Sequence, residues 1–265
     1  MRRFATLVAV LLLGVGAPPA AAAESAALAL VFATDVSGSV TPDTYLLQMD
    51  GIARAIEDPR IVEAIAAAPG GIEVLLLQWS SPRDVVVSVP WTRLEDAAGA
   101  RRFASRVRRA RRSSRGLTAI GAAILAAMKQ FDGLPVPAAR RVIDVSGDGM
   151  ANFGVSPAVA RDAAVKAGIT INGLAVLSRE PWLEGYYRHQ VIGGPAAFAL
   201  AARGPASFAA AMLRKLALEI SGIPPELALY GPVIPAKAGI RSREVRSLAL
   251  DPRLSGGDDK RPQMQ

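Results

Sequence analysis

Short apolar runs alternate with longer amphipathic stretches through the middle of the chain. Residues 27–33 are apolar without interruption and lead to Asp35, a pattern typical of a strand buried on both faces. Residues 142–145 and 169–177 repeat this pattern, and residues 197–201 form a shorter apolar piece. These runs predict the strands of a largely buried sheet.

Helical periodicity fills the intervals between these runs. Thr41 and Pro42 are typical of a helix start, and apolar residues then recur at helical spacing. The arginine-rich stretch 94–110 has the spacing of an amphipathic surface helix, whereas the stretch 118–131 is apolar on nearly every side and predicts a buried helix. The helices expected in this way cover residues 41–56, 94–110, 118–131, 156–167 and 205–221.

Residues 72–78 and 85–89 are two further strand-like runs joined by a short polar link. A parallel crossover needs about a dozen residues or more, so these strands should form an antiparallel hairpin with one strand at a sheet edge. Together with the alternation of strands and helices, this hairpin predicts a doubly wound α/β domain over residues 24–223. Its sheet should be mostly parallel with one antiparallel edge strand, and helices should cover both faces.

The two ends of the chain differ from this domain. Residues 1–23 have the layout of a signal peptide, in which two arginines precede an apolar stretch and an Ala-x-Ala sequence ends before Glu24. Cleavage there would leave an exported protein, periplasmic or extracellular. A retained anchor is the alternative, because residues 4–23 just reach the roughly 20 residues that span a bilayer. Residues 224–265 are rich in proline and glycine and predict a disordered tail.

Composition narrows the possible chemistry. The chain has no cysteine and one histidine, His189, which excludes disulfides, thiol nucleophiles, iron–sulfur clusters and zinc sites of Cys and His. A metal bound by this chain must therefore be a hard cation held by oxygen. Of the formal net charge of +8, two charges fall in the predicted signal peptide and three beyond Gly231. Only a small positive charge remains with the domain.

Oxygen-bearing side chains gather where the predicted strands end. Carboxyl ends of parallel strands form one rim, at which doubly wound domains bind ligands where the strand order reverses. Two carboxylates and three hydroxyls at this rim would suit Mg²⁺, or Mn²⁺ or Ca²⁺ in its place. The five candidate ligands are Asp35, Ser37, Ser39, Thr118 and Asp148.

The order and spacing of these five residues resemble the metal-ion-dependent adhesion site of von Willebrand factor A-type domains. Asp35, Ser37 and Ser39 match the first motif of that site, Thr118 the second and Asp148 the third. The similarity extends over about 200 residues and is closest to a secreted bacterial subgroup. It implies a non-enzymatic module whose metal bridges to a carboxylate of a protein partner.

An enzyme is the alternative function. Asp148 and its flanking glycines also resemble a motif of haloacid-dehalogenase-type phosphatases, in which Asp35 would be the nucleophile and Lys129 would lie between the two motifs. That chemistry needs a second carboxylate two residues after Asp35 as general acid and base, and Ser37 stands there. A hydrolase built on His189 lacks the usual serine motif.

Eight arginines lie within residues 101–115. Those in the predicted helix are interpreted as a solvated face, and those beyond it as an electropositive collar that steers an acidic partner toward the metal. The collar consists of Arg111, Arg112 and Arg115. Nucleic acid is not expected, because aromatic residues do not alternate with these arginines; anionic lipid headgroups and surface polysaccharide remain open.

Three aromatic residues and the single histidine lie in residues 180–194, a segment that is predicted to be irregular. They either cover an edge of the core or line the partner surface. These residues are Trp182, Tyr186, Tyr187 and His189.

Overall fold

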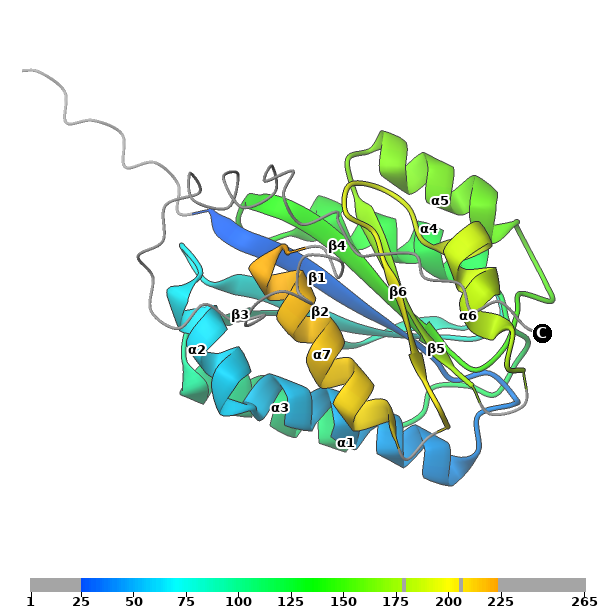
Figure 1. Ribbon diagram of the computed structural model, residues 1–265, viewed down its shortest axis with the longest axis horizontal. Coiled ribbons are helices and arrows are strands. Elements are labelled where there is room, and N and C mark those ends of the chain that lie inside the picture. The colour runs from blue at the N-terminus through cyan, green and yellow to red at the C-terminus, as the bar shows by residue number, and fades with distance from the viewer. Residues whose placement is uncertain (1–24, 178–179, 205–206, 224–265) are drawn as a thin grey trace, which may run out of the picture.

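Strands and helices alternate along the computed structural model, which describes residues 25–177, 180–204 and 207–223 (Figure 1). The strands are β1 (Ala26–Asp35), β2 (Ile72–Trp79), β3 (Val85–Leu94), β4 (Ala138–Gly147), β5 (Thr170–Val176) and β6 (Ala199–Ala202). The helices are α1 (Pro42–Glu57), α2 (Pro59–Ala67), α3 (Ala97–Arg109), α4 (Ile120–Gln130), α5 (Pro157–Lys166), α6 (Leu183–Tyr186) and α7 (Phe208–Ser221). Two short turns complete the order, η1 (Phe131–Gly133) and the π-helical η2 (Tyr187–Val191).

The six strands form one sheet in the order β3-β2-β1-β4-β5-β6. All neighbouring pairs are parallel except β2 and β3, which are antiparallel. The predicted fold class is therefore confirmed, including the antiparallel edge strand. From β1 the chain moves outward through β2 and β3 and then returns to β4 on the other side of β1, so the strand order reverses between β1 and β4. This is the position at which a doubly wound sheet offers a ligand site.

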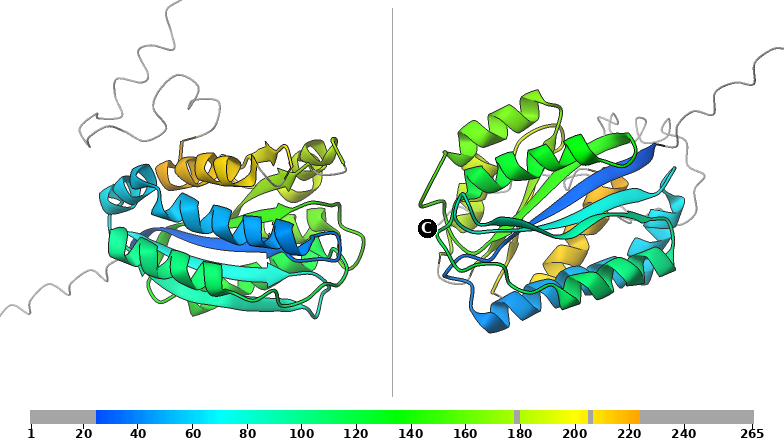
Figure 2. Two further views of the ribbon diagram at one scale, coloured as in Figure 1. Left: turned by 90° about the horizontal axis from the view of Figure 1, so that it is seen from below. Right: turned by 180° about the vertical axis from the view of Figure 1, so that it is seen from behind.

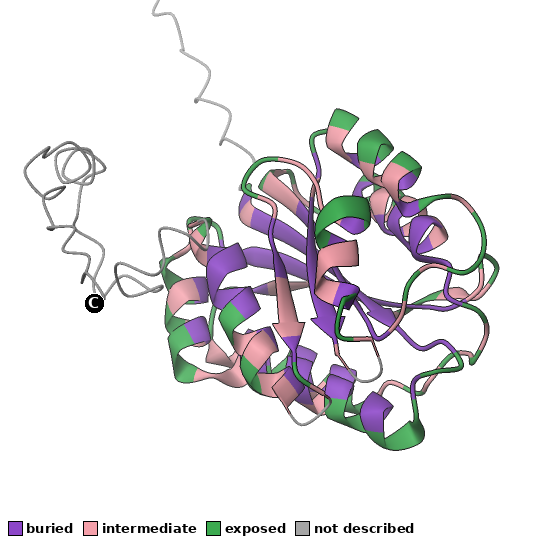
Figure 3. Ribbon diagram, turned by 45° about the vertical axis from the view of Figure 1, so that its right-hand side comes forward, coloured by how far each residue is buried: buried purple, intermediate pink, exposed green. Residues whose placement is uncertain are grey.

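Helices cover both faces of the sheet and bury its inner strands β1, β2 and β5 almost completely, whereas the edge strand β3 stays partly exposed (Figures 2 and 3). On one face, α1, α2, α3 and α7 enclose a core that includes Phe32 and Phe103. On the other face, α4, α5 and the segment from α6 through η2 enclose a second core that includes Trp79 and Tyr187. Most strand residues facing each core are apolar, so burying them drives the assembly of both layers.

The edge strand β3 is irregular. Its pairing with β2 shifts register twice, between Val74 and Leu76 and again between Leu76 and Leu77. It also contains Pro90, which has no backbone N–H to donate to a neighbouring strand. The outer edge of β3 is therefore an interrupted row of hydrogen-bonding groups.

Local capping moves several helix boundaries from their predicted places. Leu94 ends β3, and α3 begins only after Asp96, whose carboxylate accepts the N–H of Gly99 at 2.7 Å. Helix α2 was not predicted, because Asp58 and Pro59 start it directly after α1 without an intervening break.

The prediction of an irregular segment after β5 was wrong, because α6 and η2 are helical. The predicted signal peptide and tail lie outside the described residues. Within the described ranges, the structure contains no helix that is both long and apolar enough to cross a membrane.

Candidate metal centre

Asp35 ends β1 at the switch point and is fully buried. Its Oδ1 accepts the backbone N–H of Ser37 at 2.7 Å. Its Oδ2 is also buried but has no hydrogen-bond partner among the described residues. Burial, followed by the nearby charge of Asp148, raises the pKa of Asp35 to about 7, although the N–H and hydroxyl of Ser37 and, to a smaller extent, the backbone N–H of Asp148 act in the opposite direction. A buried carboxylate oxygen without a partner is costly to the fold.

A chain of hydroxyls connects the loop after β1 to the end of β4. The Oγ atoms of Ser37 and Ser39 are 3.2 Å apart, and Ser39 donates its hydroxyl to Asp148 Oδ1 at 2.6 Å. Asp148 directly follows β4 and is mostly buried. Four of the five predicted ligands are thus joined by direct contacts: Asp35, Ser37, Ser39 and Asp148.

Thr118 is held at the same rim by its backbone. Its N–H donates to Oδ1 of Asn152 at 2.9 Å, and its carbonyl accepts the N–H of Asn152 at 3.0 Å. Two residues earlier, the carbonyl of Gly116 accepts the N–H of Gly38 at 2.9 Å. These contacts tie the Thr118 segment to the loops that carry the serines and Asp148. The Thr118 hydroxyl itself makes no hydrogen bond to a described residue.

Gly147 allows the carboxylate of Asp35 to lie against the backbone of β4. A Cβ at this position would be 2.9 Å from Asp35 Oδ2 and 2.8 Å from the Tyr187 hydroxyl, which is too close for either contact. Tyr187 is buried, and its hydroxyl has no hydrogen-bond partner among the described residues. Burial raises the pKa of Tyr187, and the charges of Asp35 and Asp148 raise it further.

Arg112 fastens the loop after β1. Its guanidinium donates to the carbonyls of Val36 (2.9 Å), Ser37 (2.6 Å) and Ser114 (3.0 Å). Burial lowers the pKa of Arg112, with a smaller lowering from Arg115, whereas Asp35 raises it. Its donors are therefore committed to the protein, and only Arg111 and Arg115 of the predicted collar are exposed.

The sequence alone did not identify Asn152 as the residue that holds the backbone of Thr118 in place. It also did not predict that Arg112 binds the carbonyls of the loop after β1. It left Tyr187 without an assigned place, and the structure puts that ring in the core beside Asp35. The other rings are arranged differently: Trp182 is 51% exposed, Tyr186 accepts the N–H of Ala151 at 3.1 Å, and His189 contacts the Gly185 carbonyl on the surface.

The donor set suits a hard divalent cation held partly by hydroxyls. Within the described residues, no group of three or more His, Asp or Glu side chains is arranged to hold a metal ion. The rim supplies two carboxylates, so a cation there depends on serine and threonine oxygens as well. The unpartnered Oδ2 of Asp35 is the observation that favours such an ion, because a cation would satisfy it.

The fold is that of von Willebrand factor A-type domains. Residues of this chain superpose on proximal thread matrix protein 1 from the mussel byssus with a TM-score of 0.60 at 12% identity, covering 75% of this chain and 48% of that one. The von Willebrand factor type A protein from Catenulispora acidiphila gives 0.54 at 17% identity, with 76% and 43% covered. The domain of the type V pili tip protein Mfa5 from Porphyromonas gingivalis gives 0.51 at 11% identity, with 77% and 97% covered. The chain thus spans about half the length of the mussel protein.

The chain belongs to the family described as protein of unknown function (DUF1194), whose model matches residues 25–224. Comparison with curated proteins found no match.

Proposed function

We propose that this domain binds Mg²⁺, or Mn²⁺ or Ca²⁺ in its place, through Asp35, Ser37, Ser39, Thr118 and Asp148, and uses the ion to engage a carboxylate of a protein partner. The observation that carries the proposal is the buried, unpartnered Oδ2 of Asp35 at the switch point of the sheet, next to a hydrogen-bonded chain of hydroxyls. A purely structural aspartate would be expected to have both oxygens satisfied.

The chemistry of the donors favours adhesion over catalysis. Hydroxyl ligands are neutral, so a cation that contacts Ser37, Ser39 and Thr118 directly, with the two aspartates acting mainly through waters, would retain attraction for an outside anion. Two residues at the rim hold the proposed ligands in position: Arg112 fixes the loop after β1, and Asn152 fixes Thr118. A bound cation would supply the electrophile to which the partner's carboxylate binds.

Two of the structural relatives support this proposal by what their names state. One structure of the mussel byssus protein has a zinc-occupied MIDAS motif, with a TM-score of 0.54 at 14% identity. Mfa5 is a pilus tip protein. We carry adhesion and a divalent metal over to this chain as part of the proposal, together with export through residues 1–23.

The exposed arginines beside the rim extend the proposal to partner recognition. Arg111 and Arg115 follow α3 and stand next to the segment that carries Thr118. Their guanidinium groups would attract an acidic partner toward the cation and raise the rate of association. Arg112 contributes charge to this collar from its tethered position.

Calorimetric titration with Mg²⁺, Mn²⁺ and Ca²⁺ tests the metal site. The native protein should bind a cation, and Asp35→Ala and Thr118→Ala should bind it at least tenfold more weakly. Asp132→Ala is the matched control, since Asp132 is an exposed carboxylate in η1, past the far end of α4. Equal binding by the native protein and both site variants would refute the proposal.

The phosphatase alternative is tested separately with a generic phosphate ester. Lys129 is exposed near the carboxyl end of α4, about 13 Å along the helix from the rim where α4 begins. Ser37 stands where a general acid is needed and contacts Asp35 through its N–H. Mg²⁺-dependent hydrolysis abolished by Asp35→Asn would establish the enzyme in place of the adhesion module.

A further inference from the structure

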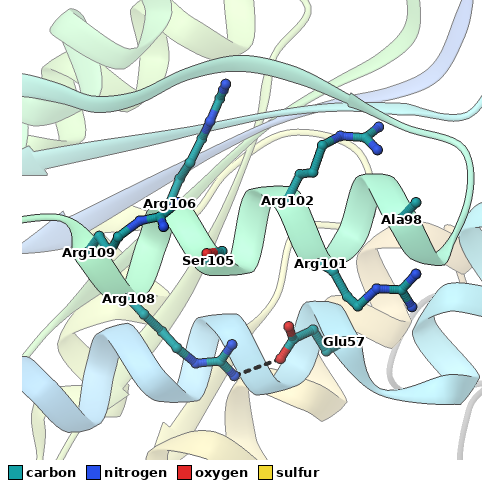
Figure 4. Close-up of a pocket in the computed structure, with 8 residues that line it drawn as sticks. All are labelled: Glu57, Ala98, Arg101, Arg102, Ser105, Arg106, Arg108 and Arg109. Atoms are coloured by element: carbon teal, nitrogen blue, oxygen red, sulfur yellow. Dashed lines mark hydrogen bonds and ion pairs between the residues drawn. The ribbon is translucent and has the colours of Figure 1, made fainter.

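The outer side of α3 carries a dense, unpaired positive charge. Five arginines line an open hollow of about 710 Å³ along this helix, together with Ala98, Ser105 and Glu57 of α1 (Figure 4). One of the five, Arg108, is paired with Glu57 at 2.6 Å and with Asp50 at 3.3 Å. The remaining four make no ion pair or hydrogen bond with any residue that the structure describes, and we call them the α3 arginines: Arg101, Arg102, Arg106 and Arg109.

This arrangement differs from an ordinary solvated helix face, which mixes both signs of charge. Residues 97–118 contain no aspartate or glutamate. Arg102, Arg106 and Arg109 follow one another at spacings of four and three residues, so they are neighbours on the helix surface. Like charges at these spacings destabilise a helix, by about 0.2–0.5 kcal/mol per pair in isolated helices. The sequence therefore keeps a repulsion that folding alone does not require.

The shape of the cluster indicates the size of its ligand. In Figure 4, Arg101 and Arg108 extend toward α1, whereas Arg102 and Arg106 extend away from it. Donors that diverge in this way cannot close around one small anion. They suit a ligand that presents several anionic groups over an area.

The chemistry of the cluster indicates phosphate. All of the basic residues within residues 97–118 are arginine, whose guanidinium binds phosphate through two parallel hydrogen bonds. The two large apolar side chains of α3, Phe103 and Val107, are fully buried against the core, and Ala98 is the only apolar residue among those that line the hollow. The hollow therefore offers no aromatic ring on which a base could stack and no apolar centre of the kind that protein interfaces have.

From these observations we propose that the α3 arginines form a docking surface for a bilayer containing anionic phospholipid. The domain rests on the headgroup phosphates without insertion, because the apolar side of α3 is already in the core. Attraction of this kind increases with each basic residue near the membrane surface and is screened by salt. The surface is separate from the metal centre and requires no divalent cation.

Co-sedimentation with vesicles tests this proposal, using the full chain in EDTA so that the outcome is independent of the metal site. We expect binding to phosphatidylcholine vesicles containing phosphatidylglycerol, loss of binding at high salt, and no binding to pure phosphatidylcholine. The quadruple variant Arg101→Gln, Arg102→Gln, Arg106→Gln and Arg109→Gln should bind the anionic vesicles at least about tenfold more weakly. Since these side chains are exposed and unpaired, circular dichroism should be that of the native protein, and the melting temperature should not fall, because the substitutions also relieve the repulsion between like charges.

The matched control removes the same charge from other elements. Arg83, Lys129, Lys166 and Arg214 are exposed and make no ion pair or hydrogen bond with a described residue, and their simultaneous replacement by Gln also lowers the net charge by four. This control should still bind the anionic vesicles. An equal loss in both variants would overturn the proposal by showing that only net charge matters. Binding to duplex DNA or heparin without binding to anionic vesicles would also overturn it, in favour of a soluble polyanion.

Discussion

Asp35 is a charged side chain placed where its charge is disfavoured. It is fully buried, one of its oxygens has no partner, and burial raises its pKa to about 7. Asp96 shows what a carboxylate with a structural task looks like, since it is partly exposed and caps α3 through the N–H of Gly99. The contrast supports the proposed role of Asp35 as a ligand of the cation.

Replacing Asp35 by Asn should therefore stabilise the metal-free protein. The amide keeps the shape and an acceptor for the N–H of Ser37, and removes a charge that is costly to bury. We expect the free energy of unfolding in EDTA at pH 8 to rise by about 1–3 kcal/mol, measured by urea denaturation. The structural control Asp96→Ala should lose about 1 kcal/mol. Destabilisation by Asp35→Asn would mean that this carboxylate serves the fold.

A second prediction about a single residue concerns the effect of Gly147 on cation affinity. In Gly147→Ala, the added Cβ would collide with Asp35 Oδ2 and the Tyr187 hydroxyl, so the carboxylate must move. Cation affinity should fall at least tenfold by calorimetry. Gly149→Ala is the control, because a Cβ there meets nothing within 4 Å. Unchanged affinity in Gly147→Ala would contradict the placement of Asp35.

Helix α7 is fastened to the sheet by a buried group of charges. Lys215 of α7 lies 2.8 Å from Asp144 of β4 and also pairs with Glu219 one turn later. Glu219 accepts a hydrogen bond from Asn172 of β5 at 2.9 Å. All four residues are almost completely buried. The last helix is thus attached to two central strands by charges whose pairing is incomplete without Lys215.

Replacing Lys215, the one positive charge in this buried group, should lower the free energy of unfolding of the whole domain. Lys215→Met keeps the length of the side chain but leaves two buried carboxylates without their partner, which typically costs about 3–5 kcal/mol. Denaturant unfolding should show this loss, and Arg214→Met, at an exposed neighbouring position, should change stability by less than about 0.5 kcal/mol. A small effect of Lys215→Met would show that α7 is held by its apolar contacts alone.

The same group predicts how stability depends on pH. Burial raises the pKa of Asp144 to about 7; Lys215 lowers it and Glu219 raises it. The unfolded value is about 3.9, so between these two pH values the folded protein binds more protons than the unfolded chain. Stability should therefore fall as pH rises from about 4 to 7.

The Asp144→Asn variant isolates this contribution. Asp35 also has a pKa raised to about 7 and acts with the same sign, so the substitution should reduce the pH slope in EDTA without abolishing it. Tyr187 is the other titratable group coupled to Asp144, and it stays neutral over this range because its pKa is raised. A slope identical to that of the native protein would show that Asp144 does not titrate in this window.

At the scale of the whole molecule, cation binding should stabilise the entire domain, because the five proposed ligands come from three separated segments that unfolding disperses. A cation at 100 times its dissociation constant adds about 2.7 kcal/mol. For a domain of this size the melting temperature should rise by roughly 5–10 °C. Calorimetric scanning with Mg²⁺ and with EDTA measures the difference, and Asp35→Ala should remove it. An unchanged melting temperature in the native protein would argue against specific binding.

The fold was predictable from sequence where burial alone decides the structure. The apolar runs at residues 27–33 and 142–145 predict β1 and β4, because a strand covered on both faces leaves few polar positions. Leu94 was assigned to a helix because its apolar side chain fits the spacing of a helix as well as that of a strand. Only its pairing with Ile72 places it in β3. The buried charges between α7 and the sheet were not predictable, because the sequence around Lys215 is typical of a lysine on the surface of a helix.

Part of the candidate site was also predictable, namely the residues that directly follow predicted strands. Asp35 and Asp148 each follow a strand, and parallel strand ends meet at one rim, so their proximity follows from the topology. The task of Arg112 depends on how the segment after α3 folds back over the loop after β1, which no local pattern encodes. Tyr187 likewise reaches Asp35 only through the π-helical turn.

The interrupted edge of β3 also bears on how copies of this domain can meet. A long regular edge strand is a template on which a second chain can add a strand and start a fibre. The register shifts and Pro90 break that template, although Val86 and Val87 are exposed beside it. In a crowded layer of these molecules the β3 edge therefore resists strand addition, and contacts at this edge are left to side chains.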